Sequence, residues 1–281
     1  MQARTKKITG LIGIIVLSIM LTQCRQSSRG TEIRNAGPID NATAETVFNE
    51  IFKTVHSLAW DNELLNGIQD SVVSNATESC VDSVIYGYST ITFPNTIVID
   101  YGLSSSCDGN YSKAGKVKVV FSDEYGASGS VATVTFSGFW MDSLAISGTL
   151  NISNNGFNSD SNLVFNIAVA NAEIESDSVN LSWNCSRRYE WISGDNTDNI
   201  SDDKFEISGA ASGRTSDGNE FDVDIISNLK YSMDCQWISE GIVEMNLGSI
   251  LAPRIIDYGS GSCDEEAVVT YKSTSYDLEM R

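Results

Sequence analysis

The spacing of apolar residues separates the chain into one helical segment and a long series of strands. Between about residues 42 and 60, Val47, Ile51, Val55 and Leu58 recur at helical spacing, which predicts an amphipathic helix. Beyond about residue 80, apolar and polar residues alternate in many segments, as in strands with one face in water. These segments are 116–122, 130–139, 144–153, 161–175, 177–193, 204–214 and 220–233.

Turn-forming residues lie between the predicted strands. They occupy 141–143, 153–156, 193–196 and 216–219, and Asp217-Gly218 is a strong hairpin signal. Short turns favour antiparallel pairing, and the strand–helix alternation of a parallel α/β sheet is absent from the sequence. We therefore predict a mostly β fold of antiparallel meander or sandwich-like sheets. A short N-terminal helix, residues 42–60, precedes them, with Asp40 or Asn41 as its N-cap.

The first residues are typical of a secretion signal. Basic residues precede an uncharged, mostly apolar run, 8–21, which is shorter than the ~20 residues of a membrane span. The run is followed by Cys24 and resembles a bacterial lipoprotein signal, although Gln23 stands where such signals usually have a small residue. We predict a signal peptide over 1–23, lipidation of Cys24 and a flexible tether over 24–41. An ordinary secretory signal or a signal anchor is the alternative.

The mature chain is strongly acidic. Removing Arg4, Lys6 and Lys7 with the signal leaves 15 basic residues against 37 acidic ones, a net charge of −22. Such a chain is repelled by nucleic acids and by anionic lipid head groups. We expect no nucleic-acid partner. The region 42–281 has the length of one large β domain or two smaller ones.

A motif of Asp-Tyr-Gly followed by Ser-Cys-Asp occurs twice, at 100–108 and at 257–264. Cys80 lies 27 residues before Cys107, and Cys235 lies 28 before Cys263. Since secretion permits disulfides, the matched spacing predicts the bridges Cys80–Cys107 and Cys235–Cys263. Each bridge would pin one of two related segments, 80–122 and 235–271.

The other motif residues have structural roles in this interpretation. Each Asp caps its own turn through its side chain, and each Gly supplies a positive φ. The alternative is that Asp100 and Asp257 form a catalytic or cation-binding pair. The remaining cysteine, Cys185, is either a buried inert thiol or an exposed one whose pKa Arg187 and Arg188 lower, and a different pairing stays open.

The same residues carry a resemblance to a family. The signal with its Cys, the blocks 92–121 and 130–136, "ISGT" at 146–149 and "IDYGSGSCDEEAVVTY" at 256–271 together resemble a group of uncharacterised lipoproteins from Bacteroidetes. The resemblance implies a membrane-tethered, all-β envelope protein, and it brings no established activity and no catalytic residues. Because the tether lacks the acidic run of some surface lipoproteins in that phylum, it implies retention on the periplasmic side of the outer membrane.

Signals for chemistry are weak. The single histidine, His56, falls inside the predicted helix, where packing or exposure is the expectation, and no zinc, redox or nucleotide motif is present. The acidic loop 195–203 has oxygen ligands suited to Ca²⁺ but lacks the pattern of a calcium loop, so we interpret it as a solvated hairpin tip. No cofactor or metal site is predicted. Trp140, expected in the turn after the strand 130–139, is the candidate ligand contact, with packing over the sheet as its alternative.

Four Asp-Ser-aliphatic tripeptides resemble the acceptor of periplasmic O-glycosylation in Bacteroidetes, and the same tripeptides also arise as turns. Their serines are Ser71, Ser83, Ser143 and Ser178. We therefore expect a membrane-tethered, non-enzymatic envelope lipoprotein that binds a glycan or protein ligand or acts as a scaffold. The alternative is a glycan hydrolase that uses a carboxylate pair.

Overall fold

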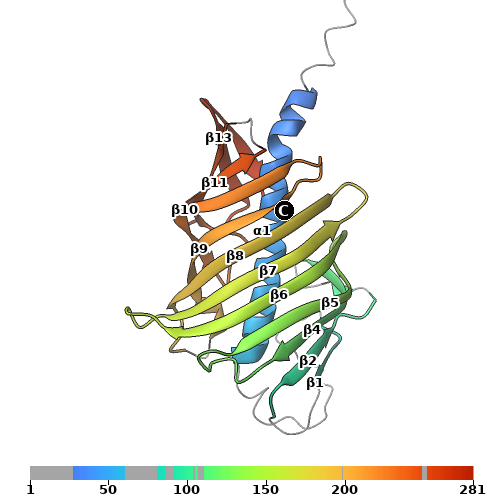
Figure 1. Ribbon diagram of the computed structural model, residues 1–281, viewed down its shortest axis with the longest axis vertical. Helices are drawn as coiled ribbons and strands as arrows, with labels where there is room; N and C mark the ends of the chain where they lie inside the picture. The colour runs from blue at the N-terminus through green and yellow to red at the C-terminus, as the bar shows by residue number, and fades with distance from the viewer. Residues whose placement is uncertain are drawn as a thin grey trace, which may run out of the picture. The chain divides into compact units, whose positions relative to one another are not determined.

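The computed structural model describes residues 28–60, 81–86, 92–103, 105–106, 111–197, 199–248 and 252–280. The chain divides into two units, Met1–Asn35 and Ala36–Arg281. In the first unit the described residues, 28–35, are helical. The second unit contains every described strand (Figure 1).

The strands form one antiparallel sheet in which neighbours along the chain are neighbours in space. Among the described residues, thirteen strands pair in chain order, β1, β2 and β4 to β14, and the short β3 pairs with β4. Strands make up most of the described residues, which confirms the predicted mostly β, antiparallel class with one N-terminal helix. The bounds are β1 (Ser83–Tyr86), β2 (Asn95–Asp100), β3 (Ser105–Ser106), β4 (Ser112–Phe121), β5 (Val131–Met141), β6 (Leu144–Phe157), β7 (Leu163–Glu175), β8 (Asn180–Ser193), the 3-10 helix η1 (Ile200–Asp202), β9 (Lys204–Arg214), β10 (Glu220–Ser232), β11 (Glu240–Leu247), β12 (Arg254–Ser260), β13 (Glu266–Tyr271) and β14 (Thr274–Glu279).

Helix α1 spans Ser28–Trp60, and its residues 36–60, which belong to the second unit, run along the inner face of this sheet (Figure 1). This part of the helix contacts strands that are far apart in the sheet: the side chain of Glu50 pairs with Lys113 on β4, and the backbone of Gly37 lies against Leu247 on β11. From residue 40 to residue 59 nearly every side chain of the helix is buried. The sheet therefore curves around α1, and the core lies between the helix and the concave face.

The helix begins earlier than the sequence analysis expects. Residues 24–41 are predicted to be a flexible tether, yet 28–41 are helical, and residues 24–27 lie outside the described residues. Asp40 is inside the helix rather than its N-cap, and its carboxylate accepts hydrogen bonds from the backbone amide and hydroxyl of Ser216. Asn41 accepts a hydrogen bond from the indole of Trp183. The partners of these polar groups come from distant strands and turns, so the local sequence resembles a solvated segment.

Two glycines mark places where the sheet bends. The β4–β5 pairing shifts register at Gly115, and the β6–β7 pairing shifts at Gly148. Both have positive φ, and an added Cβ would lie 2.0 Å or 2.7 Å from backbone atoms of the facing strand. Because bulges bend a strand and increase its twist, these shifts help the sheet curve around the helix.

Three of the predicted turns are confirmed and one is wrong. Residues 142–143, 195–196 and 216–217 form turns between successive strands, whereas β6 continues through 153–156 to Phe157. Asn154 is buried there, and its side-chain amide donates a hydrogen bond to the backbone oxygen of Tyr125. A residue typical of turns thus holds a distant loop, and the hairpin turn follows at 158–162.

The repeated Asp-Tyr-Gly motif has the same local structure in both places. The carboxylate of Asp100 accepts a hydrogen bond from the amide of Gly102, and Asp257 accepts one from Gly259, both at 2.9 Å. Both glycines have positive φ, and the tyrosine of each motif is buried. The predicted roles of Asp and Gly are therefore confirmed. The first motif ends β2 at Asp100, as expected, whereas the second lies within β12, which continues to Ser260.

Candidate functional site

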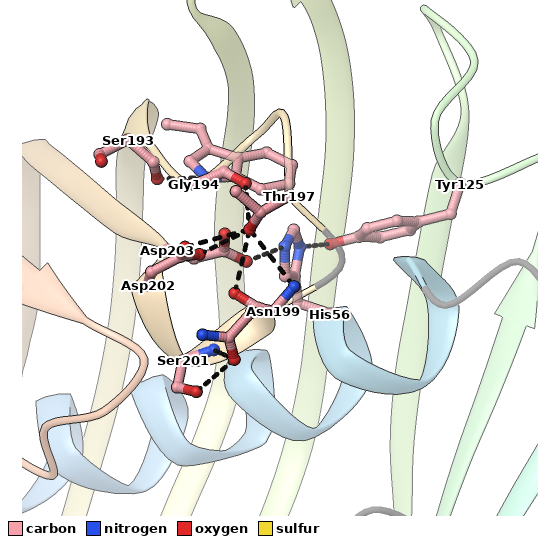
Figure 2. A network of polar contacts seen from close by, with 10 residues as sticks. His56, Tyr125, Ser193, Gly194, Thr197, Asn199, Ser201, Asp202 and Asp203 are labelled. Atoms are coloured by element: carbon pink, nitrogen blue, oxygen red, sulfur yellow. Dashed lines mark hydrogen bonds and ion pairs between the residues drawn. The ribbon is translucent and has the colours of Figure 1, made fainter.

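The single histidine of the chain lies in a closed polar network near the end of α1 (Figure 2). Nδ1 of His56 lies 3.1 Å from the hydroxyl of Tyr125, which belongs to the turn between β4 and β5. Nε2 lies 3.5 Å from Oδ2 of Asp203, the residue before β9. Each of these side chains is at least 97% buried, because His56, Tyr125 and Asp203 are 0%, 3% and 1% exposed.

Aromatic rings enclose the imidazole. Their centroids lie 4.9–5.8 Å from that of His56, and the rings are Phe52, Trp60, Tyr125, Phe165, Trp191 and Phe205. Burial lowers the pKa of His56, and the nearby carboxylate of Asp203 offsets this only in part. Burial also raises the pKa of Tyr125 well above its ordinary value. Both side chains are therefore neutral at pH 7.

The order Tyr125, His56, Asp203 has the form of a nucleophile, a base and an orienting carboxylate. A substrate would have to reach the tyrosine hydroxyl, and neither the ring of His56 nor Tyr125 offers more than 3% of its surface to solvent. The network therefore ties the end of the helix to a turn and to the residue before β9. Of the two expectations for His56, packing or exposure, packing is the one observed.

In the acidic loop 195–203, the polar side chains from Thr197 to Asp203 that are described contact other protein groups (Figure 2). The hydroxyl of Thr197 donates a hydrogen bond of 2.9 Å to the carboxylate of Asp202, and Asp203 turns inward to His56. In the parts of the chain with described positions, no three His, Cys, Asp or Glu side chains are grouped as metal ligands. The loop closes over the helix end.

Two further buried ion pairs join α1 to the sheet. Glu45 contacts Arg187 on β8, and Glu50 lies 2.8 Å from Nζ of Lys113 on β4. Although burial disfavours its charge, the carboxylate of Glu45 holds the pKa of Arg187 above its ordinary value. These pairs fix the depth and rotation of the helix inside the sheet.

An open groove of about 600 Å³ lies on the outer face of the sheet, over β8 to β11. Its polar side chains stand opposite one another across adjacent strands, because the register aligns them in two rows. The first row is Asn184, Ser212, Asp222 and Asn246. The second is Ser186, Ala210 and Asp224, and Glu244 on β11 stands opposite Asp224 at the end of this row.

The strand period and small side chains account for this groove. Cys185, Ala211 and Val223 point into the core, so their neighbours along each strand point outward. Serine and alanine at the centre of the two rows leave space above the sheet. The groove is not predicted from the sequence. Alternation in 220–224 indicates that Asp222 and Asp224 face solvent, but it does not show which side chains stand opposite them on the neighbouring strands, because that depends on the register.

Trp140 lies at the end of β5 and not in the turn, because the strand continues to Met141. The expected position is therefore wrong, and of the two alternatives, exposure and packing over the sheet, the structure has the exposed one, since 43% of the residue is accessible. Ala114 on β4 and Ala145 on β6 stand opposite the tryptophan. These small flanking side chains explain why so much of the indole remains uncovered.

The cysteines follow the prediction wherever they are described. Cys235 and Cys263 form a disulfide. Cys185 is buried without a disulfide partner, and burial raises the pKa of its thiol to about 12. Of the two expectations for Cys185, the buried, unreactive thiol is therefore the one that agrees with the structure. Cys24, Cys80 and Cys107 lie outside the described residues.

The serines of the Asp-Ser-aliphatic tripeptides have different surroundings. Ser143 and Ser178 are exposed in the turns before β6 and β8, where a modifying enzyme has access. Ser83 is the half-buried first residue of β1, and Ser71 lies outside the described residues.

Within the described ranges, no helix combines the length and the apolar composition needed to cross a membrane. Comparison of the chain with known protein families, with curated proteins and with solved structures finds no match.

Proposed function

We propose that this chain is a tethered, non-enzymatic binding protein of a bacterial cell envelope, with its ligand on the outer face of the sheet. The observation that carries the proposal is where the folded protein leaves room for a ligand. The helix fills the concave side, where one hollow between α1 and the sheet measures only about 10 Å³, the size of a single water. The groove of about 600 Å³ on the outer face falls within the range of ligand sites, about 300–1,000 Å³.

The tether is inferred from the sequence. The apolar run before Cys24 and the resemblance to Bacteroidetes lipoproteins support lipid attachment at this cysteine, with the chain on the periplasmic side of the outer membrane. The partners in this proposal are the membrane, through the anchor, and a glycan or protein ligand or scaffolded protein. A net charge of −22 after cleavage argues against nucleic acid.

The competing function is carboxylate-dependent glycan hydrolysis. A hydrolase places one carboxyl group on each side of the scissile bond. Asp222 and Asp224 occupy alternate positions of one strand, so they extend from the same part of the groove. This arrangement suits holding a ligand better than cleaving it.

Two measurements test the proposal. Cells that express the full chain are labelled with a fatty-acid analogue, and we expect the label to disappear in Cys24→Ser; undiminished labelling contradicts the tether.

The second measurement separates binding from hydrolysis. The purified protein is run through gels containing soluble polysaccharides, and the same mixtures are assayed for new reducing ends. Retardation without cleavage supports a binding protein, whereas sustained release of reducing ends makes the chain an enzyme.

A further inference from the structure

We propose that the groove over β8 to β11 binds a linear, uncharged oligosaccharide that lies across the strands. This inference rests on the proposed function as a binding protein, and it names the surface and the ligand class. The groove is independent of Trp140, which belongs to β5.

The polar groups of the groove have capacity for a ligand. Among the described residues, no hydrogen bond or ion pair engages the side chains of Ser186, Ser212, Asp222, Asp224 or Asn246. The carbonyl oxygen of Asn184 accepts a hydrogen bond from the backbone amide of Asn171, which orients its amide nitrogen. Water occupies these groups in the unbound protein, and a ligand must replace those hydrogen bonds one for one.

The donors and acceptors match hydroxyl groups. A carboxylate only accepts hydrogen bonds, whereas serine and asparagine side chains both donate and accept. A sugar hydroxyl also does both, so it satisfies any of these residues. Neighbouring strands lie about 4.8 Å apart, so a row across four strands extends about 14 Å. A chain of several sugar units can therefore contact successive side chains along each row.

The same side chains disfavour other ligand classes. Ala210 is the only exposed apolar side chain in the two rows, so an apolar ligand gains little. Asp222 and Asp224 repel phosphate, sulfate and uronic acid groups. A polyamine or lysine-rich peptide would be attracted to Asp222, Asp224 and the neighbouring Glu244. Four neutral polar side chains nevertheless outnumber these three carboxylates: Asn184, Ser186, Ser212 and Asn246. The lining is therefore suited to hydroxyl groups more than to positive charge.

The test measures binding of hexasaccharides to the full chain by calorimetry in about 150 mM salt, which screens non-specific charge effects. The probes are cellohexaose, xylohexaose, mannohexaose, maltohexaose and chitohexaose, with spermine as the cationic probe. The double variant Asp222→Asn/Asp224→Asn keeps the size of both side chains and removes their charge. Asp277→Asn, an exposed aspartate on β14, is the matched control for the chemical change.

We expect at least one hexasaccharide to bind, and the double variant to bind it at least about tenfold more weakly at an unchanged melting temperature. Ala210→Gln, which fills the groove without altering charge, should weaken binding similarly, and Asp277→Asn should not. The proposal is overturned if no hexasaccharide binds, or if spermine alone binds. Equal binding by wild type and both groove variants, with loss in Trp140→Ala, would move the ligand to another surface and leave the proposed binding function standing.

Discussion

At the scale of single residues, His56 links stability to pH. Its pKa is lowered in the folded state because the ring is fully buried, and only Asp203 opposes the shift. An unfolded chain has an ordinary histidine pKa of about 6.5, so below this pH the unfolded state binds a proton that the folded state does not. Stability from this group is complete above about pH 6.5. It declines as pH falls through the window between 6.5 and the lower folded pKa.

We expect this contribution to change by up to about 1.4 kcal/mol per pH unit inside that window. Urea unfolding of wild type and His56→Phe between pH 5 and 7 measures it, because the carboxylates other than Asp203 contribute equally to both proteins. The stability advantage of wild type over the variant should shrink as pH falls. Parallel stability curves would contradict the assignment of a lowered pKa to His56.

Cys185 is expected to be unreactive in the folded protein. Burial removes its thiol from solvent and raises its pKa to about 12, so almost no thiolate is present at pH 8. A thiol-specific chromogenic reagent should label it only after guanidinium unfolding, with Cys185→Ser as the control. Rapid labelling of native wild type that the variant loses would be incompatible with the buried position.

At the scale of elements, the charges of α1 specify how the helix is seated. The pair of Glu45 and Arg187 is buried, so removing one partner leaves an uncompensated charge inside the sheet. We expect Arg187→Met to lower the free energy of unfolding by about 3–5 kcal/mol. The double variant Glu45→Leu/Arg187→Met removes both charges and should recover most of the loss in chemical denaturation. A double variant as unstable as the single one would indicate that packing of the arginine stem matters more than the charge.

The disulfides also belong to this scale. The observed bridge closes a segment of 28 residues, and in the chain-entropy model such a loop contributes about 3–4 kcal/mol. Peptide mapping without reduction should find Cys235 joined to Cys263 and Cys80 joined to Cys107. A peptide that joins the segments 80–122 and 235–271, or one that contains Cys185 in a bridge, would refute the pairing of Cys80 with Cys107.

Local pattern predicts the type of each element well and its surroundings poorly. Alternation identifies most strands, and Asp217-Gly218 identifies its turn, because both depend on a few neighbouring residues. Asp40 and Asn41 are predicted as N-cap residues and Asn154 as a turn residue, because a local pattern does not show their partners. Those partners, Ser216, Trp183 and Tyr125, are far away in the chain. The groove depends on register in the same way, so no single strand reveals it.

At the scale of the folded unit, the concave face of the sheet packs against the helix, and the outer face is left for a ligand. The sheet uses its concave side to enclose α1, and the helix carries both apolar and polar groups that the sheet matches. A ligand that needed the concave side would have to displace the helix and break these contacts. Binding on the outer face leaves the core intact, so we expect the ligand there.

Hydrogen exchange of the helix amides, followed by mass spectrometry on the intact protein, tests this central claim most directly. If α1 permanently fills the sheet, amides between residues 40 and 59 exchange only through global unfolding and belong to the slowest set, together with β7 and β8. Exchange of these helix amides much faster than that of β7 and β8 would contradict the account, because the helix would then leave the sheet and open its concave face to ligands.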